Sequence, residues 1–582
     1  MNPQTTFAHW LKHVDADTRA QMERMTDEQI ATHFAAGLAF GTAGLRGIML
    51  PGPGGVNGYT IAAATQGLAN YLLANSNPPV GAGSTRPCTS VSAASLSVVI
   101  GYDSRNNSQS FARIAAKVLA GNGITAYIFD DMRPTAMVSH AVRKMSAAAG
   151  ITITASHNPR EYNGYKVYAA DGTQLGLAQA TAIAAQINAV DPFIDVKLCD
   201  ESAIDTGLIR FMPHEVEEDY LASVHAEQVN RSVIAQAADK LRIVYTPLHG
   251  AGAVIVPDVL RRVGVRNLFT VAEQMAPNGD FPTVDSPNPE AFDNFRHGIK
   301  MAEKHDCNLV IATDPDADRV GVVARNENGE FVAITGNQMG ALLLEYILTA
   351  YAESDTLPPR PYAVKTIVTS ELAAAVCAYH GIKMYDLLTG FKYIGEVIAE
   401  NDRSDGDSFI LGFEESYGYL KGTYTRDKDA VVTTLLIVEM AAHYAMQGKT
   451  LLDALHELFE RHGYFRESSI NLAKRGPTAA ADMAALMNGL RSAPPSALGG
   501  LKVLATRDYL TSIRTDHASG EQSKLTLPTS DVLYFELEGG NAVAIRPSGT
   551  EPKVKIYILA RGDSSDRAAA IVTALEREVA AW

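Results

Sequence analysis

One order of hydrophobic and polar positions occurs three times along the chain. In the first copy, the apolar run at residues 96–100 predicts a strand, residues 111–119 place apolar side chains at helical spacing, and a glycine stop precedes a second apolar run at 124–129. The second copy spans residues 241–268 and the third spans 362–384. A strand, a helix, a glycine stop and a strand form a βαβ unit, so the pattern predicts three similar α/β domains with mixed sheets.

The last part of the chain follows a different pattern. Apolar runs at residues 532–537, 542–545 and 554–557 are separated by short polar segments that contain glycine, and residues 565–581 read as a final helix. Consecutive short strands of this kind predict an antiparallel meander. We therefore expect a fourth, C-terminal domain of the α+β class.

Length, charge and composition narrow the class of protein. A chain of 582 residues is too long for one core and corresponds to about four domains at ~150 residues each. The net charge of −15 argues against nucleic acid and anionic membranes as partners, so local basic groups must attract any anionic substrate. The amino-terminal stretch lacks the apolar core of a signal peptide and no later run is long enough to span a bilayer, which predicts a cytoplasmic protein. The Ser- and Pro-rich residues 78–95 read as a surface insertion.

The first candidate for chemistry is Thr154-Ala155-Ser156-His157-Asn158-Pro159. It follows an apolar, β-branched run, so Ser156 is expected just beyond the end of a strand, where α/β proteins place reactive groups. The segment sets a hydroxyl nucleophile beside an imidazole. Taken alone, such a pair is more often an ordinary hydrogen-bonded cap or loop.

The second candidate is Thr313-Asp314-Pro315-Asp316-Ala317-Asp318-Arg319, which follows the apolar residues 309–311. In an extended segment, alternate residues point to the same side, so the three carboxylates are expected to converge. Converging carboxylates repel one another unless a cation lies between them, and hard oxygen ligands suit Mg²⁺. The alternatives are a solvated acidic turn and a structural Ca²⁺ loop.

Two further loops carry groups that bind sugars and phosphates. Arg546-Pro547-Ser548-Gly549-Thr550-Glu551-Pro552-Lys553 offers a guanidinium fork, two hydroxyls and a glycine at which backbone amides can approach an anion. The alternative there is a hairpin turn in which Arg546 pairs with Glu551. Gly412-Phe413-Glu414-Glu415-Ser416-Tyr417-Gly418 offers carboxylate acceptors for sugar hydroxyls, although similar segments are common on solvated surfaces.

Taken in chain order, these four segments, preceded by Phe40-Gly41-Thr42-Ala43-Gly44-Leu45-Arg46-Gly47, resemble the α-D-phosphohexomutase superfamily. Within it, the chain is most similar to the phosphoglucomutase branch of the bacterial, phosphopentomutase-like type. The resemblance spans the whole chain and implies four domains around a central active-site cleft. These are a phosphoserine-loop domain at 1–207, a metal-binding domain at 208–326, a sugar-binding domain at 327–460 and a C-terminal phosphate-binding domain at 461–582.

The resemblance also implies a reaction. An intramolecular phosphotransferase of the isomerase class would interconvert glucose 1-phosphate and glucose 6-phosphate through a phosphoserine at Ser156 and a glucose 1,6-bisphosphate intermediate, which also acts as activator. One Mg²⁺ per chain would bridge that phosphoserine to Asp314, Asp316 and Asp318. The only partner implied is a small sugar phosphate, and the chain is expected to be a monomer or a weak dimer.

Further site residues follow from positions that match the family. Lys166 and Lys392 match positions that face the reacting centre, Arg46 is expected to hold phosphoryl oxygens, and His157 is either the general base or orients the serine. The expected substrate-binding residues are Arg319, Thr389, Gly390, Glu414, Ser416, Arg546, Ser548, Gly549 and Thr550.

The choice of sugar rests on two loops. The segment Thr389-Gly390-Phe391-Lys392-Tyr393 departs from the Trp-containing version of animal-type glucomutases, and Glu414-Glu415-Ser416-Tyr417 departs from the Gly-Glu-Met-Ser-Gly loop of mannomutases. Glucose phosphates are therefore the first expectation, and a phosphopentomutase or phosphomannomutase on the same scaffold is the alternative. A phosphatase with Asp314 as nucleophile and a non-catalytic sugar-phosphate sensor rank lower, because neither needs serine, acidic triad and phosphate loop together.

Overall fold

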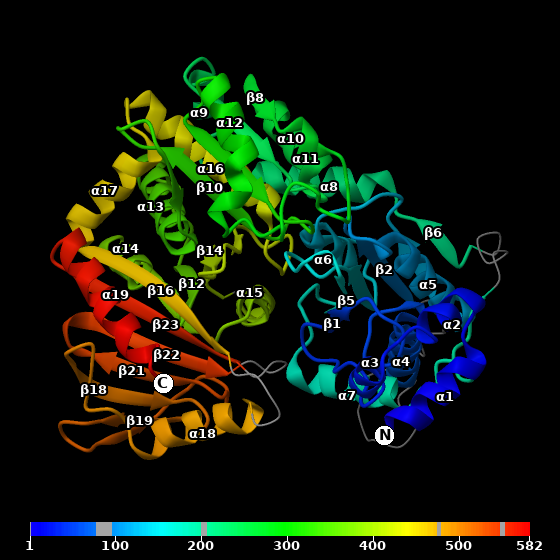
Figure 1. Ribbon diagram of the computed structural model, residues 1–582. Helices are drawn as coiled ribbons and strands as arrows, with labels where there is room; N and C mark the ends of the chain where they lie inside the picture. Colours follow the sequence, from blue (N-terminus) through cyan, green and yellow to red (C-terminus); the bar gives the residue numbers. More distant parts are fainter. Residues whose placement is uncertain (1, 77–95, 200–206, 405, 474–478, 548–552) are drawn as a thin grey trace. The chain divides into compact units, whose positions relative to one another are not determined.

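The computed structural model describes residues 2–76, 96–199, 207–404, 406–473, 479–547 and 553–582 (Figure 1). The chain forms two compact units. Unit 1 comprises Met1–Ala333, Gly395–Gly406 and Gly418–Met446, and unit 2 comprises Ile334–Ile394, Asp407–Tyr417 and Gln447–Trp582. The Ser- and Pro-rich segment predicted to be a surface insertion lies outside the described residues.

The first sheet of unit 1 is mixed and has the strand order β1-β5-β4-β2-β3-β6. Parallel pairing joins β2 to β3 and β4, whereas β5 pairs antiparallel with β4 and β1. Its core packs the apolar side chains of β2 and β4 against α4 and α5, and α4 lies beside α7 (Figure 1). The elements of this part are α1 (Pro3–His13), α2 (Ala16–Met22), α3 (Asp27–His33), β1 (Leu45–Ile48), α4 (Gly58–Ser76), β2 (Ser97–Tyr102), α5 (Ser108–Gly121), β3 (Thr125–Ile128), α6 (Thr135–Lys144), β4 (Ala149–Ile153), β5 (Tyr162–Ala169), α7 (Leu177–Asn188) and β6 (Ile209–Phe211).

The second sheet of unit 1 is also mixed, with the order β11-β10-β9-β7-β8. β7 pairs in parallel with β8 and β9, and β9 and β10 form an antiparallel hairpin in which Thr313 faces Val320. All five residues of β9 are buried, as its unbroken apolar run predicts. The elements are α8 (His214–Ala226), α9 (Val233–Gln236), β7 (Arg242–Thr246), α10 (Gly252–Arg262), β8 (Asn267–Thr270), α11 (Ala272–Met275), α12 (Arg296–Lys304), β9 (Leu309–Thr313), β10 (Val320–Arg325), β11 (Phe331–Ile334) and α16 (Ala430–Met446). The short strand β15 (Tyr419–Leu420) also lies in unit 1 but is not part of this sheet.

In unit 2, β12 lies between β13 and β14 and pairs with both in parallel. The helices α13 and α14 pack together and both contact α17. The elements are α13 (Gly336–Ser354), β12 (Pro361–Thr366), α14 (Glu371–Tyr379), β13 (Lys383–Leu387), β14 (Ser408–Phe413) and α17 (Leu451–His462). The helix α15 (Phe391–Ser404) begins in unit 2 and continues in unit 1 from Gly395.

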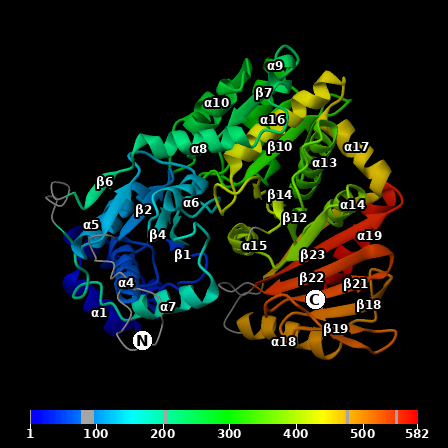
Figure 2. The same ribbon diagram turned by 180° about the vertical axis from the view of Figure 1, so that it is seen from behind.

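The rest of unit 2 is an antiparallel sheet of eight strands with the path β16-β23-β22-β21-β18-β19-β20, to which β17 adds beside β18. The meander predicted from the last apolar runs is β21, β22 and β23, and the final helix α19 packs on β23 and β16 (Figure 2). The elements are β16 (Tyr464–Ala473), α18 (Ala479–Ser492), β17 (Ala497–Leu498), β18 (Leu501–Asp508), β19 (Ile513–Asp516), β20 (Gln522–Lys524), β21 (Leu533–Leu537), β22 (Asn541–Pro547), β23 (Lys553–Gly562) and α19 (Ser565–Val579).

The predicted βαβ units and their glycine stops are confirmed. The three units are β2-α5-β3, β7-α10-β8 and β12-α14-β13, each with parallel strands. The glycines that follow the helices, Gly123, Gly264 and Gly381, have φ of 75°, 94° and 68°. Only glycine adopts this left-handed conformation without a steric cost, which explains why each helix ends there.

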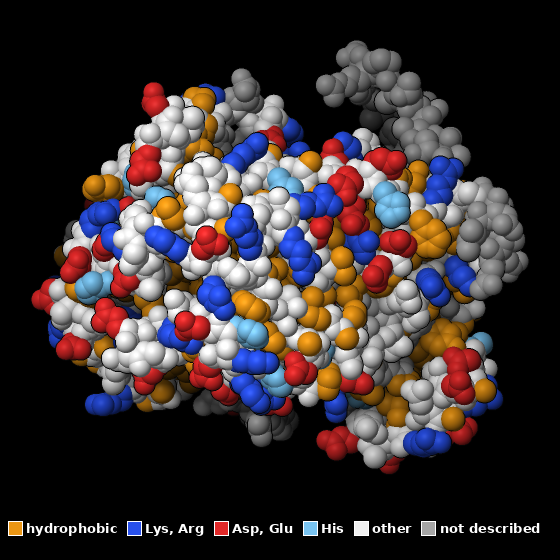
Figure 3. Space-filling view, turned by 90° about the horizontal axis from the view of Figure 1, so that it is seen from above, with side chains coloured by type: hydrophobic (Ala, Val, Ile, Leu, Met, Phe, Trp, Pro, Cys, Tyr) orange, Lys and Arg blue, Asp and Glu red, His pale blue; other side chains and the backbone are white. Residues whose placement is uncertain are grey.

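Two properties, the distribution of surface charge and the apolarity of the helices, relate to the predictions about nucleic acid and membranes. Basic and acidic side chains are interspersed over the face shown in Figure 3, although the net charge of the chain is −15. No single helix in the described part of the chain combines the length and apolarity needed to cross a bilayer; the bent pair α16 and α17 reaches them only when both helices are counted together.

Candidate active site

The loop that carries Ser156 begins directly after β4, as its apolar approach predicts. Ser156 is only 6% exposed and has a φ of 52°, a left-handed conformation that is uncommon for a residue with a side chain. The hydroxyl of Thr154 accepts a hydrogen bond from the Ser156 amide at 2.8 Å. A residue kept in such a conformation requires surroundings that fix it, and those surroundings come from a different part of unit 1. We call residues 154–159 the serine loop.

Arg105 fixes the serine loop through its backbone carbonyls. The guanidinium, whose side chain is fully buried, donates to the carbonyl oxygens of Ser156 at 2.5 Å, of Asn158, of Pro159 at 2.8 Å and of Tyr162 at 3.0 Å. Asp103 lies 3.4 Å from its Nε and also accepts from the Thr154 hydroxyl at 2.6 Å. The ion pair therefore joins β2 to both ends of the loop.

The three aspartates lie in the turn of the β9-β10 hairpin. One oxygen of each of Asp314, Asp316 and Asp318 lies within 4.8 Å of the others, and the three residues are 0%, 0% and 2% exposed. The predicted convergence is confirmed, but the predicted reason is wrong. The segment is a turn and not an extended strand: Ala317 has a φ of 50°, and one oxygen of Asp314 accepts the amides of Asp318 at 3.1 Å and Arg319 at 3.0 Å. We call residues 314–318 the acidic loop.

Lysines from two other segments balance the charge of the acidic loop. Nζ of Lys166, on β5, lies 2.9 Å from Asp316 and 3.1 Å from Asp318, and Nζ of Lys428 lies 3.3 Å from Asp318. Burial alone would lower the pKa of Lys166, but Asp316 and Asp318 outweigh it and raise that pKa above its ordinary value. Burial would likewise raise the pKa of Asp318, but Lys166 and Lys428 lower it.

The acidic loop fits a hard divalent cation. Oδ1 of Asp316 and Oδ1 of Asp318 are buried and have no hydrogen-bond partner among the described residues. A buried carboxylate oxygen without a partner is costly, and a metal ion removes that cost. Three carboxylates without nitrogen or sulfur ligands favour Mg²⁺, with open positions for a phosphoryl oxygen. The same cluster contains Ser156, whose hydroxyl donates to Asp314 at 2.7 Å.

Three more predicted residues surround Ser156 in unit 1. Nδ1 of His157 lies 3.2 Å from the Ser156 hydroxyl, and its pKa is held well below the ordinary value by burial and then by Arg319 and Arg46. Arg46 donates to the Asn158 side chain at 2.8 Å, and Arg319 donates to Glu290 at 2.6 Å. Unit 1 therefore brings together Ser156, His157, Lys166, Arg46, Arg319 and the three aspartates.

The predicted sugar-binding residues lie in unit 2. Glu414 follows β14 and is 6% exposed, and it accepts the Gly390 amide at 3.0 Å. Thr389, which precedes Gly390, and Ser416, which lies two residues after Glu414, are both partly exposed. Lys392 lies in the first turn of α15, with Nζ 4.6 Å from the ring centroid of Tyr393. We call residues 413–417 the sugar loop.

Glu415, the neighbour of Glu414, has a raised pKa. Burial, followed by the charge of Glu414, raises the pKa of Glu415 to about 7, whereas Lys555 and Arg546 oppose the shift. Arg546 is partly exposed near the end of β22, opposite Lys555 on β23. The other predicted members of the phosphate loop, Ser548, Gly549 and Thr550, lie outside the described residues.

Sequence reasoning missed Lys428 and the pair Asp103 and Arg105. A signal for Lys428 was present: Arg426-Asp427-Lys428-Asp429 places four charges directly before the apolar helix α16, and all four residues are buried. Charged residues are rarely buried without a defined partner, so such a run indicates a site. Arg105 gives no comparable signal, because its carbonyl partners lie 51 to 57 positions further along the chain.

Comparison with known proteins agrees with this arrangement. Three family models match the chain, described as phosphoglucomutase/phosphomannomutase alpha/beta/alpha domains I, II and III, at residues 37–192, 218–329 and 335–462. A phosphoglucomutase of Staphylococcus epidermidis strain ATCC 35984 is 37% identical over 529 residues, which are 91% of this chain and 92% of the relative. A phosphoglucomutase of Staphylococcus haemolyticus is 36% identical over 96% of this chain and 97% of its own.

Solved structures share the fold at lower identity. The open form of the Paramecium phosphoprotein pp63/parafusin, a phosphoglucomutase, matches with a TM-score of 0.68 and 17% identity over 93% of this chain and 94% of its own. A putative phosphomannomutase from Thermus thermophilus matches with a TM-score of 0.66 and 23% identity over 94% of this chain and 99% of its own. From the family models and the two staphylococcal relatives together, the chain belongs to the phosphoglucomutase/phosphomannomutase family.

Proposed function

We propose that the protein is a phosphoglucomutase that interconverts glucose 1-phosphate and glucose 6-phosphate through a phosphoserine at Ser156. The observation that carries the proposal is the hydroxyl of Ser156 held 2.7 Å from Asp314, inside a buried carboxylate cluster, in a chain 37% identical to a phosphoglucomutase. A free serine hydroxyl is a poor nucleophile, whereas a phosphoserine is a phosphoryl donor when a cation offsets the charge on its oxygens.

The reaction consists of two phosphoryl transfers. In the first, the bond between phosphorus and Oγ of Ser156 breaks as a sugar hydroxyl forms a new bond to phosphorus, which yields glucose 1,6-bisphosphate. In the second, the other phosphoryl group returns to Ser156, and the sugar leaves with its phosphate moved between C1 and C6. Each transfer releases the proton of the attacking hydroxyl, and that proton needs an acceptor.

The residues of unit 1 take roles that follow from their contacts. Mg²⁺ held by Ser156, Asp314, Asp316 and Asp318 would withdraw charge from the phosphoryl oxygens when it is bound. Lys166 keeps the acidic loop compact, and Arg46 and Arg319 supply the positive charge for phosphoryl oxygens. His157, 3.2 Å from the Ser156 hydroxyl, is placed to exchange a proton with it. Lys166 and Lys392 remain the other candidate acids and bases.

The residues of unit 2 are proposed to bind the sugar and its non-reacting phosphate. Glu414 and Ser416 would pair sugar hydroxyls, with Thr389 and Gly390 shaping the adjoining loop, and Arg546 with Ser548, Gly549 and Thr550 would hold the phosphate. The hydrogen bond from the Gly390 amide to Glu414, at 3.0 Å, supports an ordered arrangement of these two segments. Glucose ranks ahead of mannose and pentose phosphates because the relatives that match over most of the chain are phosphoglucomutases.

Three further properties belong to the proposal. We propose four domains at 1–207, 208–326, 327–460 and 461–582; the ranges of the three family models support the first three divisions, apart from residues 327–329 and 461–462. We also propose a cytoplasmic location and a monomeric or weakly dimeric state. Size-exclusion chromatography with light scattering measures the last of these.

The experiment that tests the function uses Ser156→Ala beside the matched control Ser223→Ala, which removes a hydroxyl from helix α8. Intact-mass measurement and peptide mapping should find phosphate on Ser156 of the wild type and of the control. Mutase turnover should be nearly abolished in Ser156→Ala alone. A Ser156→Ala protein with turnover close to the wild type would refute the phosphoserine cycle.

A substrate panel tests the choice of sugar. Specificity constants are compared for glucose, mannose, ribose and deoxyribose 1-phosphates, with a trace of glucose 1,6-bisphosphate as activator. Glucose 1-phosphate should have the highest constant, because buried polar groups that a pentose leaves unpaired reduce its binding in the transition state. Higher constants for the pentose phosphates would identify a phosphopentomutase instead.

A further inference from the structure

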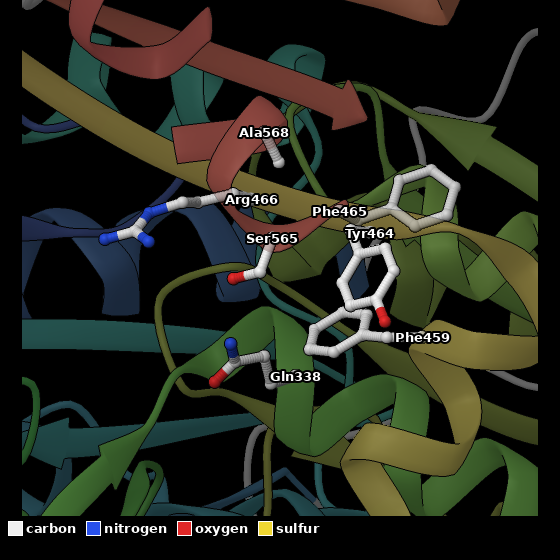
Figure 4. A pocket seen from close by; sticks show the side chains of 7 residues that line it. All are labelled: Gln338, Phe459, Tyr464, Phe465, Arg466, Ser565 and Ala568. Atoms are coloured by element: carbon white, nitrogen blue, oxygen red, sulfur yellow. The ribbon is translucent and has the colours of Figure 1, made fainter. Parts of the chain in front are cut away.

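A small cavity lies in unit 2, and its lining residues include none of the predicted site residues. Its volume is about 100 Å³, and it forms where the first turns of α13 and α19 meet the end of α17 and the start of β16 (Figure 4). α13, the junction of α17 with β16, and α19 are far apart in the sequence. We call this feature the β16 cavity, and its lining divides into a polar edge and an aromatic wall.

The polar edge consists of hydrogen-bond donors. The guanidinium of Arg466 forms no ion pair or hydrogen bond with any residue that the structure describes, and it is exposed. Gln338 uses its carbonyl oxygen to accept the Thr335 amide at 3.0 Å, which leaves the NH₂ group to donate. The hydroxyl of Ser565 lies on the same side as these two groups (Figure 4). The lining residues include no carboxylate, and Asp566, the next residue in the chain, is not among them.

Two helices add positive potential at this edge. α13 has 19 residues and α19 has 15, and both begin at the β16 cavity. The amide groups at a helix amino terminus together carry a partial positive charge, which stabilises anions. One amide of each helix is already capped: the Gln338 amide of α13 donates to the Thr335 hydroxyl, and the Arg567 amide of α19 donates to the Ser564 hydroxyl. The polar edge therefore combines a full charge on Arg466 with the ends of two helix dipoles.

The aromatic wall gives the cavity a closed side. The rings of Phe459 and Tyr464 stack with centroids 5.8 Å apart and an interplanar angle of 25°, and Phe465 is 7% exposed. A volume of about 100 Å³ holds the space of roughly three waters, well under the roughly 300 Å³ or more of sites that enclose a whole ligand. The cavity therefore matches one tetrahedral oxyanion whose remaining atoms, if any, extend into solvent.

Arg466 of the β16 cavity is separated along the sheet from Arg546 of the predicted phosphate loop. Along β23, Arg466 faces Ala560 and Arg546 faces Lys555. Five residues of a strand correspond to roughly 17 Å, so one phosphate group cannot contact both arginines. The cavity also lies where the third family domain, which ends at residue 462, adjoins the C-terminal sheet.

We propose that the β16 cavity is a second binding site for a phosphate group, with Arg466 as its charged ligand and Ser565 and Gln338 as its neutral donors. Inorganic phosphate and the phosphate of a sugar monoester share the required chemistry. The site carries no reacting group, so its occupant would brace α13 and α19 together rather than undergo chemistry there.

Equilibrium dialysis with radiolabelled inorganic phosphate tests the proposal at constant ionic strength. The wild type should bind one more equivalent per chain than Arg466→Ala, because the active site contributes equally to both proteins. The control Arg567→Ala removes a neighbouring exposed arginine of α19 that does not line the cavity, and it should bind as many equivalents as the wild type. Mutase turnover and the Tm without phosphate should be equal in all three proteins, which shows that they are folded.

Competition distinguishes the sources of the phosphate. If glucose 6-phosphate displaces the extra equivalent at lower concentration than unlabelled phosphate does, the occupant is a sugar monoester; if phosphate is the stronger competitor, it is the free anion. Both results support the site. The proposed site would be overturned if the wild type and Arg466→Ala bound phosphate with the same stoichiometry and affinity. It would also be overturned if Arg567→Ala lost as many equivalents of bound phosphate as Arg466→Ala.

Discussion

The serine loop and the sugar loop differ in how deeply their side chains are buried and in how many of their polar groups are paired within the protein. Ser156 is 6% exposed, and three backbone carbonyls of the serine loop, those of Ser156, Asn158 and Pro159, are held by the buried Arg105. In the sugar loop, Glu414 is as deeply buried, but Glu415, Ser416 and Tyr417 are partly exposed. The first loop has its polar groups paired within the protein, and the second keeps several of them available.

This difference follows from the chemistry that each loop is proposed to perform. A phosphoryl group is transferred fastest between groups whose positions and charges are fixed beforehand, because no reorganisation is then needed at the transition state. Sugar recognition instead needs acceptors that exchange water for substrate hydroxyls. Substitutions in the serine loop and its supports should therefore affect stability and turnover, whereas substitutions in the sugar loop should affect KM and pH dependence.

The largest effect is expected for Arg105→Ala. The change leaves Asp103 buried without its cation and removes a donor from four carbonyl groups, so the free energy of unfolding should fall by about 3–5 kcal/mol. Urea denaturation measures this loss, and kcat should fall with it because Ser156 loses its support. Arg113→Ala, at an exposed position of α5, should stay within about 0.5 kcal/mol of the wild type. A loss below about 1 kcal/mol for Arg105→Ala would show that the loop holds its shape without the ion pair.

Asp316→Asn should reduce turnover with little change in stability. The amide keeps the shape of the side chain but removes one charge from the acidic loop, so kcat should fall roughly 100-fold and saturation should require more Mg²⁺. Turnover measured over a Mg²⁺ series reports both effects, and the exposed Asp293→Asn serves as control. Full activity of the wild type in excess EDTA would contradict a metal role for the acidic loop.

The serine loop and the acidic loop show how far the sequence predicts the site. Apolar periodicity places β4 and β9 correctly, and both reactive loops follow those strands. The convergence of the three aspartates depends on the left-handed Ala317, which no periodicity indicates. Arg105 and Lys428 reach their partners across 51 and 110 positions, and only the tertiary fold brings them there. Sequence patterns predict elements and their ends, whereas the supports of a site come from distant segments.

Glu414→Gln should change substrate binding more than turnover. The amide still accepts the Gly390 amide but loses the charge that strengthens hydrogen bonds to sugar hydroxyls, so KM for glucose 1-phosphate should rise roughly tenfold. Steady-state kinetics separates KM from kcat. Glu415→Gln is the matched neighbour, and it should change KM less. If kcat falls while KM stays constant, Glu414 acts on the reacting groups and the contrast between the loops is wrong.

The smallest effect is expected for Glu415→Gln, which should change how the stability of the folded protein depends on pH. The pKa of Glu415 is about 7 in the folded protein against an ordinary value of 4.5, so the folded state binds more protons than the unfolded state between these limits. Stability therefore falls as pH rises from about 4.5 to about 7, and it stays lower above that range. Because the carboxyl is partly exposed and water screens it, the loss should be about 1 kcal/mol. Glu415→Gln should thus raise the Tm above that of the wild type at pH 8.5 and match it at pH 4.5. The exposed Glu353→Gln should show no such crossover, and a Tm difference for Glu415→Gln that is constant across this range would assign the effect to packing instead of ionisation.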